Sequence, residues 1–176
     1  MTVAGPDLSF HPLTRRDFPL LSNWLARPHV AEWWGTHQPT AVEEEFGPCV
    51  DGTDPTRVFV CLLAGTPVGL LQVYRLDDNP DYARAVGLEQ AAGMDLFLGD
   101  AERCNRGLGP DIIAAALDMI WAAYPEVTRA MAGPSVRNAR SIRAFEKSGF
   151  TAVGAVRVPG EEDEEMVLLC PRPTAA

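Results

Sequence analysis

Residues 93–109 read GMDLFLGDAERCNRGLG, and an amphipathic pattern follows them. Met94 to Leu98 is apolar, as expected for a buried strand, except for the carboxylate of Asp95. A short polar turn comes next, then the glycine-rich Arg106-Gly-Leu-Gly109, and Pro110 suits the first turn of a helix. Backbone N–H groups and the positive end of a helix converge in such an arrangement. The stretch therefore predicts a loop that binds a phosphate-bearing ligand.

The glycine-rich loop alone leaves the ligand open. It lacks the Lys-Ser/Thr of a P-loop, which disfavours hydrolysis of a nucleoside triphosphate. It also lacks the third glycine of a dinucleotide-binding fingerprint, because Ile112 stands at that position. Glycines that serve only to pack a helix start are the other reading of this loop.

Hydrophobic patterns along the rest of the chain predict an α+β fold. Strands are expected at residues 8–13, 57–64, 68–74, 94–98, 127–131, 151–158 and 166–170. Helices are expected from Thr14 to the residues before Pro28, at 30–34, at 40–46, from Pro110 to Tyr124 and at 135–148. Residues 75–92 are expected to form a long loop. The sheet should be mixed but mainly antiparallel, flanked by helices, in a single domain that spans residues 1–176.

The composition limits the possible partners. The 24 acidic and 15 basic residues give a net charge of −9, which argues against a nucleic-acid partner and is compatible with a cationic small molecule. Charge that only keeps the protein soluble is the other reading. We expect no membrane partner, because no apolar run approaches the roughly 20 residues of a membrane span. No secretory signal is recognisable at residues 1–7, so a cytoplasmic location is expected.

The cysteines and histidines do not suggest a metal site. The four cysteines are scattered without a CxxC pair and are expected to be reduced thiols. The three histidines lie in the first quarter of the chain and form no HExxH pair. We therefore expect no bound metal.

Two segments together resemble the GNAT superfamily of N-acetyltransferases. Residues 93–109 resemble its acetyl-CoA-binding motif, and SVRNARSIRAFEKSGF at residues 135–150 resembles its second cofactor motif. The two motifs occur in the order and at the separation usual for that superfamily. The resemblance implies the GNAT fold, with acetyl-CoA as the cofactor.

The N-terminal part of the chain narrows the resemblance. Together with the later motifs, Trp24-Leu25 and HVAEWWG at residues 29–35 look like the aminoglycoside 6′-N-acetyltransferases, over about residues 8–169. Siderophore-biosynthesis acyltransferases, which acylate a lysine side chain, share the same frame but typically have His where this chain has Asp95. Asp95 thus favours the aminoglycoside branch. The acyltransfer to lysine or another small amine stays open, as does a GNAT-fold module that binds acyl-CoA without catalysis.

The resemblance also implies a cofactor site. Backbone N–H groups around the glycine-rich loop would hold the pyrophosphate of coenzyme A, and Arg106 would add a charge-assisted contact. Main-chain groups of Phe97 and Leu98 would pair with the pantetheine arm, and N–H groups near residues 96–98 would polarise the thioester. Asn138 would bond the arm. The implied cofactor-binding residues are Phe97, Leu98, Asn105, Arg106, Gly107, Leu108, Gly109, Asn138 and Arg143.

Asp95 is the candidate catalytic residue. Alternation along the strand places Asp95 with Phe97 on one face and Met94, Leu96 and Leu98 on the other. A carboxylate in an apolar strand needs a partner, and a substrate ammonium is one. Asp95 would orient the amine and accept its proton directly or through water. A purely structural carboxylate is the other reading of Asp95.

Aromatic and polar residues are candidates for the substrate site. In the resembled family the tryptophan pair borders the aminoglycoside pocket, where stacking and cation–π contacts suit a polycationic sugar. Ordinary core packing is the other reading of this pair. Polar residues of the strand before the long loop lead toward the same region. The expected substrate-binding residues are Trp33, Trp34, Gln72, Tyr74 and Asp95.

Three positions depart from the family pattern. Phe145 stands where many members have a tyrosine thought to protonate the departing thiolate. Gly133 stands where the aminoglycoside enzymes often have an acidic residue, so one contact to a substrate ammonium would be missing. Cys104 replaces a usual Gln or Arg before the glycine-rich loop and would face phosphate rather than thioester, so no covalent acyl relay is expected.

The protein is expected to be a monomer or a homodimer.

Overall fold

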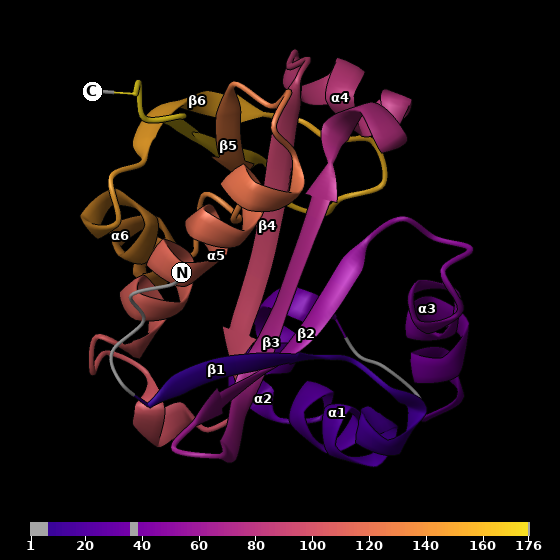
Figure 1. Cartoon of the computed structure of the whole chain (residues 1–176). Coiled ribbons are helices and arrows are strands. Elements are labelled where there is room, and N and C mark those ends of the chain that lie inside the picture. The colour runs from indigo at the N-terminus through magenta and orange to yellow at the C-terminus, as the bar shows by residue number, and fades with distance from the viewer. Residues whose placement is uncertain (1–6, 36–38, 176) are drawn as a thin grey trace.

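A mixed sheet organises the computed structural model, which describes residues 7–35 and 39–175 (Figure 1). Its seven strands lie in the order β1-β2-β3-β4-β5-β7-β6. Every neighbouring pair is antiparallel except β4 and β5, which are parallel. This confirms the predicted sheet. The strands are β1 (Leu8–Pro12), β2 (Arg57–Leu63), β3 (Thr66–Arg75), β4 (Ala91–Leu98), β5 (Arg129–Ala132), β6 (Thr151–Val156) and β7 (Glu165–Pro171).

Helices cover both faces of the sheet, as Figure 1 shows. They are α1 (Phe18–Leu25), α2 (Pro28–Trp34), α3 (Pro39–Asp51), α4 (Pro80–Val86), α5 (Leu108–Ala123) and α6 (Ala139–Lys147). On one face, Met94 of β4 shares an apolar cluster with Ile112 of α5 and Phe145 of α6. On the other face, Phe97 of β4 shares a cluster with residues of α1, α2 and α3, including Leu25. Met94 and Phe97 thus face opposite sides, as the alternation predicted.

The prediction of a long loop at residues 75–92 is wrong. This stretch contains a 3-10 turn at Leu76–Asp78 and the helix α4. Asn79 caps α4, because its side chain accepts a hydrogen bond from the backbone N–H of Tyr82 at 3.2 Å. Pro80 takes the first helical position and Gly87 ends the helix with a φ of 70°. The capping signals were present in the sequence, but the stretch lacks the long apolar stripe that makes a helix recognisable.

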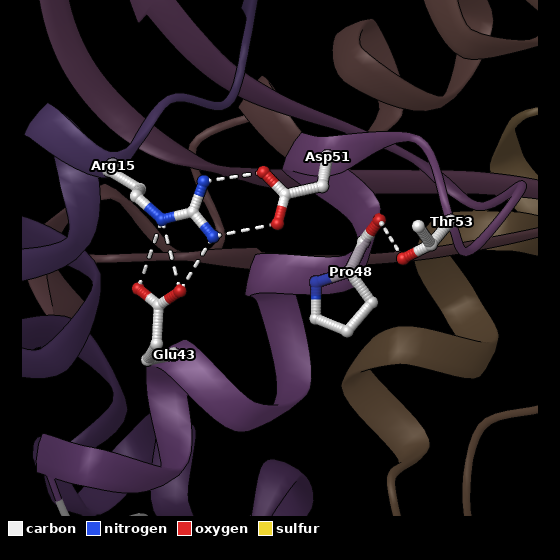
Figure 2. Close-up of polar contacts among 5 residues, drawn as sticks. All are labelled: Arg15, Glu43, Pro48, Asp51 and Thr53. Carbon is white, nitrogen blue, oxygen red and sulfur yellow. Dashed lines mark hydrogen bonds and ion pairs between the residues drawn. The ribbon is translucent and has the colours of Figure 1, made fainter.

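The helix predicted at residues 40–46 extends further, through Pro48 to Asp51. A proline inside a helix removes a backbone hydrogen bond. Arg15 bridges the two sides of this defect (Figure 2), donating from Nη2 to Glu43 and from Nη1 to Asp51, both at 2.6 Å. The Arg15 guanidinium also holds the pKa of Asp51 below its ordinary value. Arg15 precedes α1 in a 3-10 turn at Arg15–Asp17, so the bridge ties α3 to α1.

β4 and β5 are paired only where they enter the sheet. The parallel register covers Ala91 to Gly93 of β4, opposite Arg129 to Met131 of β5. Beyond Gly93, β4 remains paired with β3 through Leu98. The second edge of β4 is therefore open from Met94 onward. The candidate site lies at this open edge of β4.

Candidate active site

A glycine-rich loop leads into α5. Asn105 and Gly107 both have positive φ values, 61° and 82°, and Gly107 is the N-cap of the helix. Only glycine adopts such a conformation at no steric cost. The first N–H groups of α5 have no partner within the helix and lie at its positive end. Leu108 packs into the core, and the side chain of Arg106 is exposed.

The open edge of β4 presents the backbone of Leu96 and Leu98. Gly99 donates its N–H to Val68 of β3 at 2.9 Å. Backbone direction alternates along a strand, so the groups of Phe97 also face β3 and those of Leu96 and Leu98 face the opening. The expectation that the Phe97 main chain pairs with pantetheine does not fit this register, because that main chain is turned toward β3 and the main chain of Leu96 faces the opening. Phe97 instead contributes its ring, which packs edge-to-face against Trp34 at 4.9 Å between centroids.

A cavity of about 240 Å³ joins the glycine-rich loop, the β4 edge and α6. Most of the predicted cofactor residues line it, whereas Arg106 and Leu108 do not. Both tryptophans of α2 line it as well. Residues that the sequence reasoning missed also line it. The predicted lining residues are Phe97, Leu98, Asn105, Gly107, Gly109, Asn138, Arg143, Trp33 and Trp34, and the missed ones include His29, Arg140, Ser141 and Lys147.

α6 gives this cavity a basic rim. Arg140, Arg143 and Lys147 are spaced three and four residues apart, which places them on one face of the helix. The helix begins at Ala139 rather than at the predicted residue 135, because Asn138 caps it by accepting a hydrogen bond from Ser141 N–H at 3.1 Å. The Asn138 side-chain oxygen is thus used by the cap. Its amide NH₂ remains for a ligand. The spacing of the cations was the available signal for this rim.

Asp95 lies beside the cofactor cavity, in a second, acidic cavity of about 490 Å³. Its strand register places it opposite Gln72 of β3. Burial raises the pKa of Asp95 to about 6, although a hydrogen bond with Tyr74 acts in the opposite direction. Among residues 7–35 and 39–175 no Lys, Arg or His forms an ion pair with Asp95. A cationic ligand would therefore supply a missing partner.

The predicted substrate residues gather around Asp95. Gln72, Tyr74 and Asp95 line a third cavity of about 550 Å³. Asp95, Trp33 and Trp34 line the acidic cavity. The same two tryptophans also border the cofactor cavity. They therefore stand at the junction of the two cavities.

Carboxylates dominate this region. The cavities around Asp95 are lined by Glu32, Glu45, Asp54, Asp78, Asp95, Glu161, Glu162, Asp163 and Glu165, with Arg75 and Arg137 as the cations. The sequence did not single out Tyr82, which lies in the expected loop at residues 75–92. It also did not single out Glu161 and Glu165, which lie between the expected strands at residues 151–158 and 166–170. Such a lining attracts cations and repels anions.

The departures from the family pattern have structural counterparts. Phe145 borders both cavities and packs against Phe150 at 5.1 Å between centroids, so no hydroxyl is available at this position. Cys104 lines the cofactor cavity with its thiol directed to the carbonyl of Asp100 at 3.9 Å. All four cysteines are free. The described residues include no His, Cys, Asp and Glu group suited to a metal ion.

Membrane insertion through a helix finds no support in the described part of the chain, where no helix has the length and apolarity to span a bilayer.

Comparisons with known proteins agree with this geometry. Residues 14–158 match the family described as "Acetyltransferase (GNAT) domain". An aminoglycoside N(6′)-acetyltransferase type 1 from Klebsiella pneumoniae is 30% identical over 164 residues, covering 90% of this chain and 81% of that protein. A lysine N-acyltransferase, MbtK, from a Mycobacterium species is 24% identical over 139 residues, covering 78% of this chain and 57% of that protein.

Solved structures of an aminoglycoside acetyltransferase share the fold of this chain. The structure of AAC(6′)-Ib in complex with paromomycin and acetyl-CoA superposes with a TM-score of 0.80 at 28% identity, covering 94% of each chain. Another structure of that enzyme holds coenzyme A and kanamycin, with a TM-score of 0.80 at 27% identity over 94% of this chain and 95% of that one.

Proposed function

The chain belongs to the GNAT acetyltransferase family, and from this premise we propose that it transfers an acetyl group from acetyl-CoA to a primary amine of a cationic small molecule. The 6′-amine of an aminoglycoside is the proposed acceptor. The two relatives that cover 90% of the chain carry that activity in their names, and the similar structures of AAC(6′)-Ib contain acetyl-CoA or coenzyme A with aminoglycosides.

One observation carries the proposal: Leu96 lies on both cavities. Its backbone faces the opening where the basic rim and the helix end favour a phosphate-bearing ligand. The carboxylate of the adjacent Asp95 lies in the acidic cavity, where a cation is favoured. An amine held at Asp95 would therefore meet a thioester held along β4.

Acetyl-CoA supplies a thioester whose acetyl carbon accepts the amine nitrogen and whose sulfur departs as thiolate. The protein's part begins with Asp95, which binds the ammonium form and accepts one of its protons directly or through water, so that the neutral amine has the lone pair that attacks the acetyl carbon. The raised pKa of Asp95, about 6, makes it a stronger base than an ordinary aspartate. The N–H groups of Leu96 and Leu98, which face the open edge of β4, would polarise the carbonyl.

Phe145 and the positions of the cysteines bear on two further steps, the departure of the thiolate and the attack by the amine. Phe145 has no proton to give, so water protonates the leaving thiolate or it departs unassisted. No cysteine faces the junction, so the amine attacks directly within a ternary complex. The four free thiols suit a reducing compartment, and we propose a cytoplasmic location, as a single domain with no membrane or nucleic-acid partner.

Release of coenzyme A with a panel of acceptors tests the proposal. We expect release with aminoglycosides that carry a 6′-amine and none with matched compounds that carry a 6′-hydroxyl. Lysine-derived acceptors serve as the second arm, because the similarity to MbtK keeps lysine acylation as the alternative. Release with lysine compounds alone would replace the aminoglycoside assignment. Binding of acetyl-CoA without release for any amine would favour a non-catalytic module.

A further inference from the structure

Glu165 occupies the space that a side chain on Gly133 would fill. A Cβ atom built on Gly133 would lie 2.4 Å from Oε2 of Glu165 and 2.8 Å from the hydroxyl of Tyr82. Both distances are too short for a real contact. The absence of a side chain at residue 133 thus makes room for a carboxylate that comes from β7, in the cavity that also contains Asp95.

The carboxylate of Glu165 is held in place from two directions. The hydroxyl of Tyr82, from α4, donates a hydrogen bond to Oε2 at 2.7 Å. The backbone of Glu165 pairs with Val156 of β6 and forms a bridge with Ser135. A side chain fixed by a short hydrogen bond and paired on two backbone sides is preorganised for a ligand.

Glu165 has no cationic partner in the described ranges 7–35 and 39–175. Arg137, a cation of the same cavity, is paired with Asp163 at 2.7 Å. Burial raises the pKa of Glu165 to about 7, opposed by the Tyr82 hydrogen bond and reinforced by the charges of Asp95 and Glu161. Two partly buried carboxylates that repel each other are stabilised most by a ligand that brings more than one positive charge.

We propose that Glu165 binds a second ammonium group of the acceptor while Asp95 holds the amine that is acetylated. This inference rests on the proposed function and assigns the acceptor's second charge to a specific residue. It makes Glu165 a specificity-determining residue that selects di- and polyamines over monoamines. Tyr82 positions its carboxylate, and Gly133 provides the space.

Calorimetric titration of the coenzyme A-bound protein with kanamycin tests this inference without requiring turnover. Glu165→Gln keeps the shape and an acceptor oxygen for Tyr82, so the fold should be retained. We expect its Kd for kanamycin to rise at least tenfold. Glu164→Gln is the matched control, since this exposed neighbour has the same charge and lies outside both cavities, and its Kd should stay within twofold of the wild type.

A second measurement compares the protons exchanged on binding by the wild type and by Glu165→Gln. Burial raises the pKa of Glu165 to about 7, so a bound ammonium should release protons from this carboxyl, and the wild type should release more protons than Glu165→Gln, as titrations in two buffers of different ionisation enthalpy detect. Equal affinity, or equal proton exchange, of wild type and Glu165→Gln would overturn the role of Glu165. Binding without acetylation would instead overturn the proposed function and leave this inference standing. A wild-type protein that does not bind kanamycin would contradict both.

Discussion

The guanidinium of Arg137 lies over the ring of Trp33, 5.8 Å from its centroid. The same guanidinium pairs with Asp163, so one internal cation occupies both an aromatic face and a carboxylate of the acidic cavity. These are the two kinds of group that would bind a cationic acceptor. Arg137 would therefore compete with a cationic acceptor for Trp33 and Asp163.

Removing this cation should strengthen acceptor binding. In Arg137→Gln the face of Trp33 and the carboxylate of Asp163 become available, and the KM for kanamycin should fall about two- to fivefold, which corresponds to a cation–π contribution of roughly 0.5–1 kcal/mol. Steady-state kinetics at fixed acetyl-CoA measure this change. Arg84→Gln, on the exposed surface of α4, removes the same charge elsewhere and should leave KM unchanged. A higher KM in Arg137→Gln would mean that Arg137 contacts the acceptor favourably.

The basic rim of α6 should determine affinity for acetyl-CoA. We expect Arg140→Gln, Arg143→Gln and Lys147→Gln each to raise the KM for acetyl-CoA about three- to tenfold, because each removes a charge that would lie near phosphate. The kcat should stay close to that of the wild type. The KM should also become less sensitive to salt. Arg129→Gln, at an exposed position of β5 outside the cavity, is the control, and an equal effect there would point to overall charge instead of the rim.

Asn138 should have two separable roles. Asn138→Ala loses the cap of α6 and should lower the free energy of unfolding by about 1 kcal/mol. Asn138→Asp keeps an oxygen for Ser141 but loses the amide NH₂, so it should retain its stability while the KM for acetyl-CoA rises. Thermal unfolding and kinetics on both variants separate the roles. An Asn138→Asp variant with wild-type kinetics would limit Asn138 to capping.

The pKa of Asp95 predicts how stability depends on pH. Burial raises this pKa from 3.8 to about 6, so between these values the folded state binds more protons than the unfolded state. The contribution of Asp95 to stability is therefore complete below pH 3.8 and is lost as pH rises through about 6. Asp95→Asn lacks this pH-dependent loss. Its free energy of unfolding minus that of the wild type should therefore be larger at pH 8 than at pH 3, by roughly 2–3 kcal/mol.

Denaturant unfolding of wild type and Asp95→Asn at both pH values provides the measurement. Glu165 titrates in the same direction with a pKa of about 7, so Glu165→Gln should show a similar trend at somewhat higher pH. A difference between wild type and Asp95→Asn that does not change with pH would indicate an ordinary pKa for Asp95.

Local patterns were sufficient for much of the fold and for part of the site. The alternation of Met94 to Leu98 correctly placed Asp95 and Phe97 on one face, since a strand's side-chain period depends only on its own residues. The glycines before α5 and the spacing of the α6 motif likewise report local geometry. α4 was missed because it is short and its stability depends on packing of Val86 with Leu76 and Met131, which is not visible locally.

The rest of the site depends on contacts between distant segments. The register between β3 and β4 determines which backbone groups of β4 face the opening. This register turns the main chain of Phe97 toward β3 and leaves that of Leu96 facing the opening. Glu165 stands in a charged stretch typical of a solvated turn, and only the pairing of β7 with β5 brings it near Asp95. No pattern within the sequence of residues 159–165 distinguishes that carboxylate from its exposed neighbours.

The proposed role of Asp95 is to serve an amine acceptor beside an independently formed site for acetyl-CoA. Its most direct test is coenzyme A release with a 6′-amino aminoglycoside, measured for wild type and Asp95→Asn, together with the Kd of each for acetyl-CoA. We predict that kcat falls at least a hundredfold in Asp95→Asn while the Kd for acetyl-CoA stays within twofold. Unchanged kcat in Asp95→Asn, or no release by the wild type with any 6′-amino compound, would contradict the account.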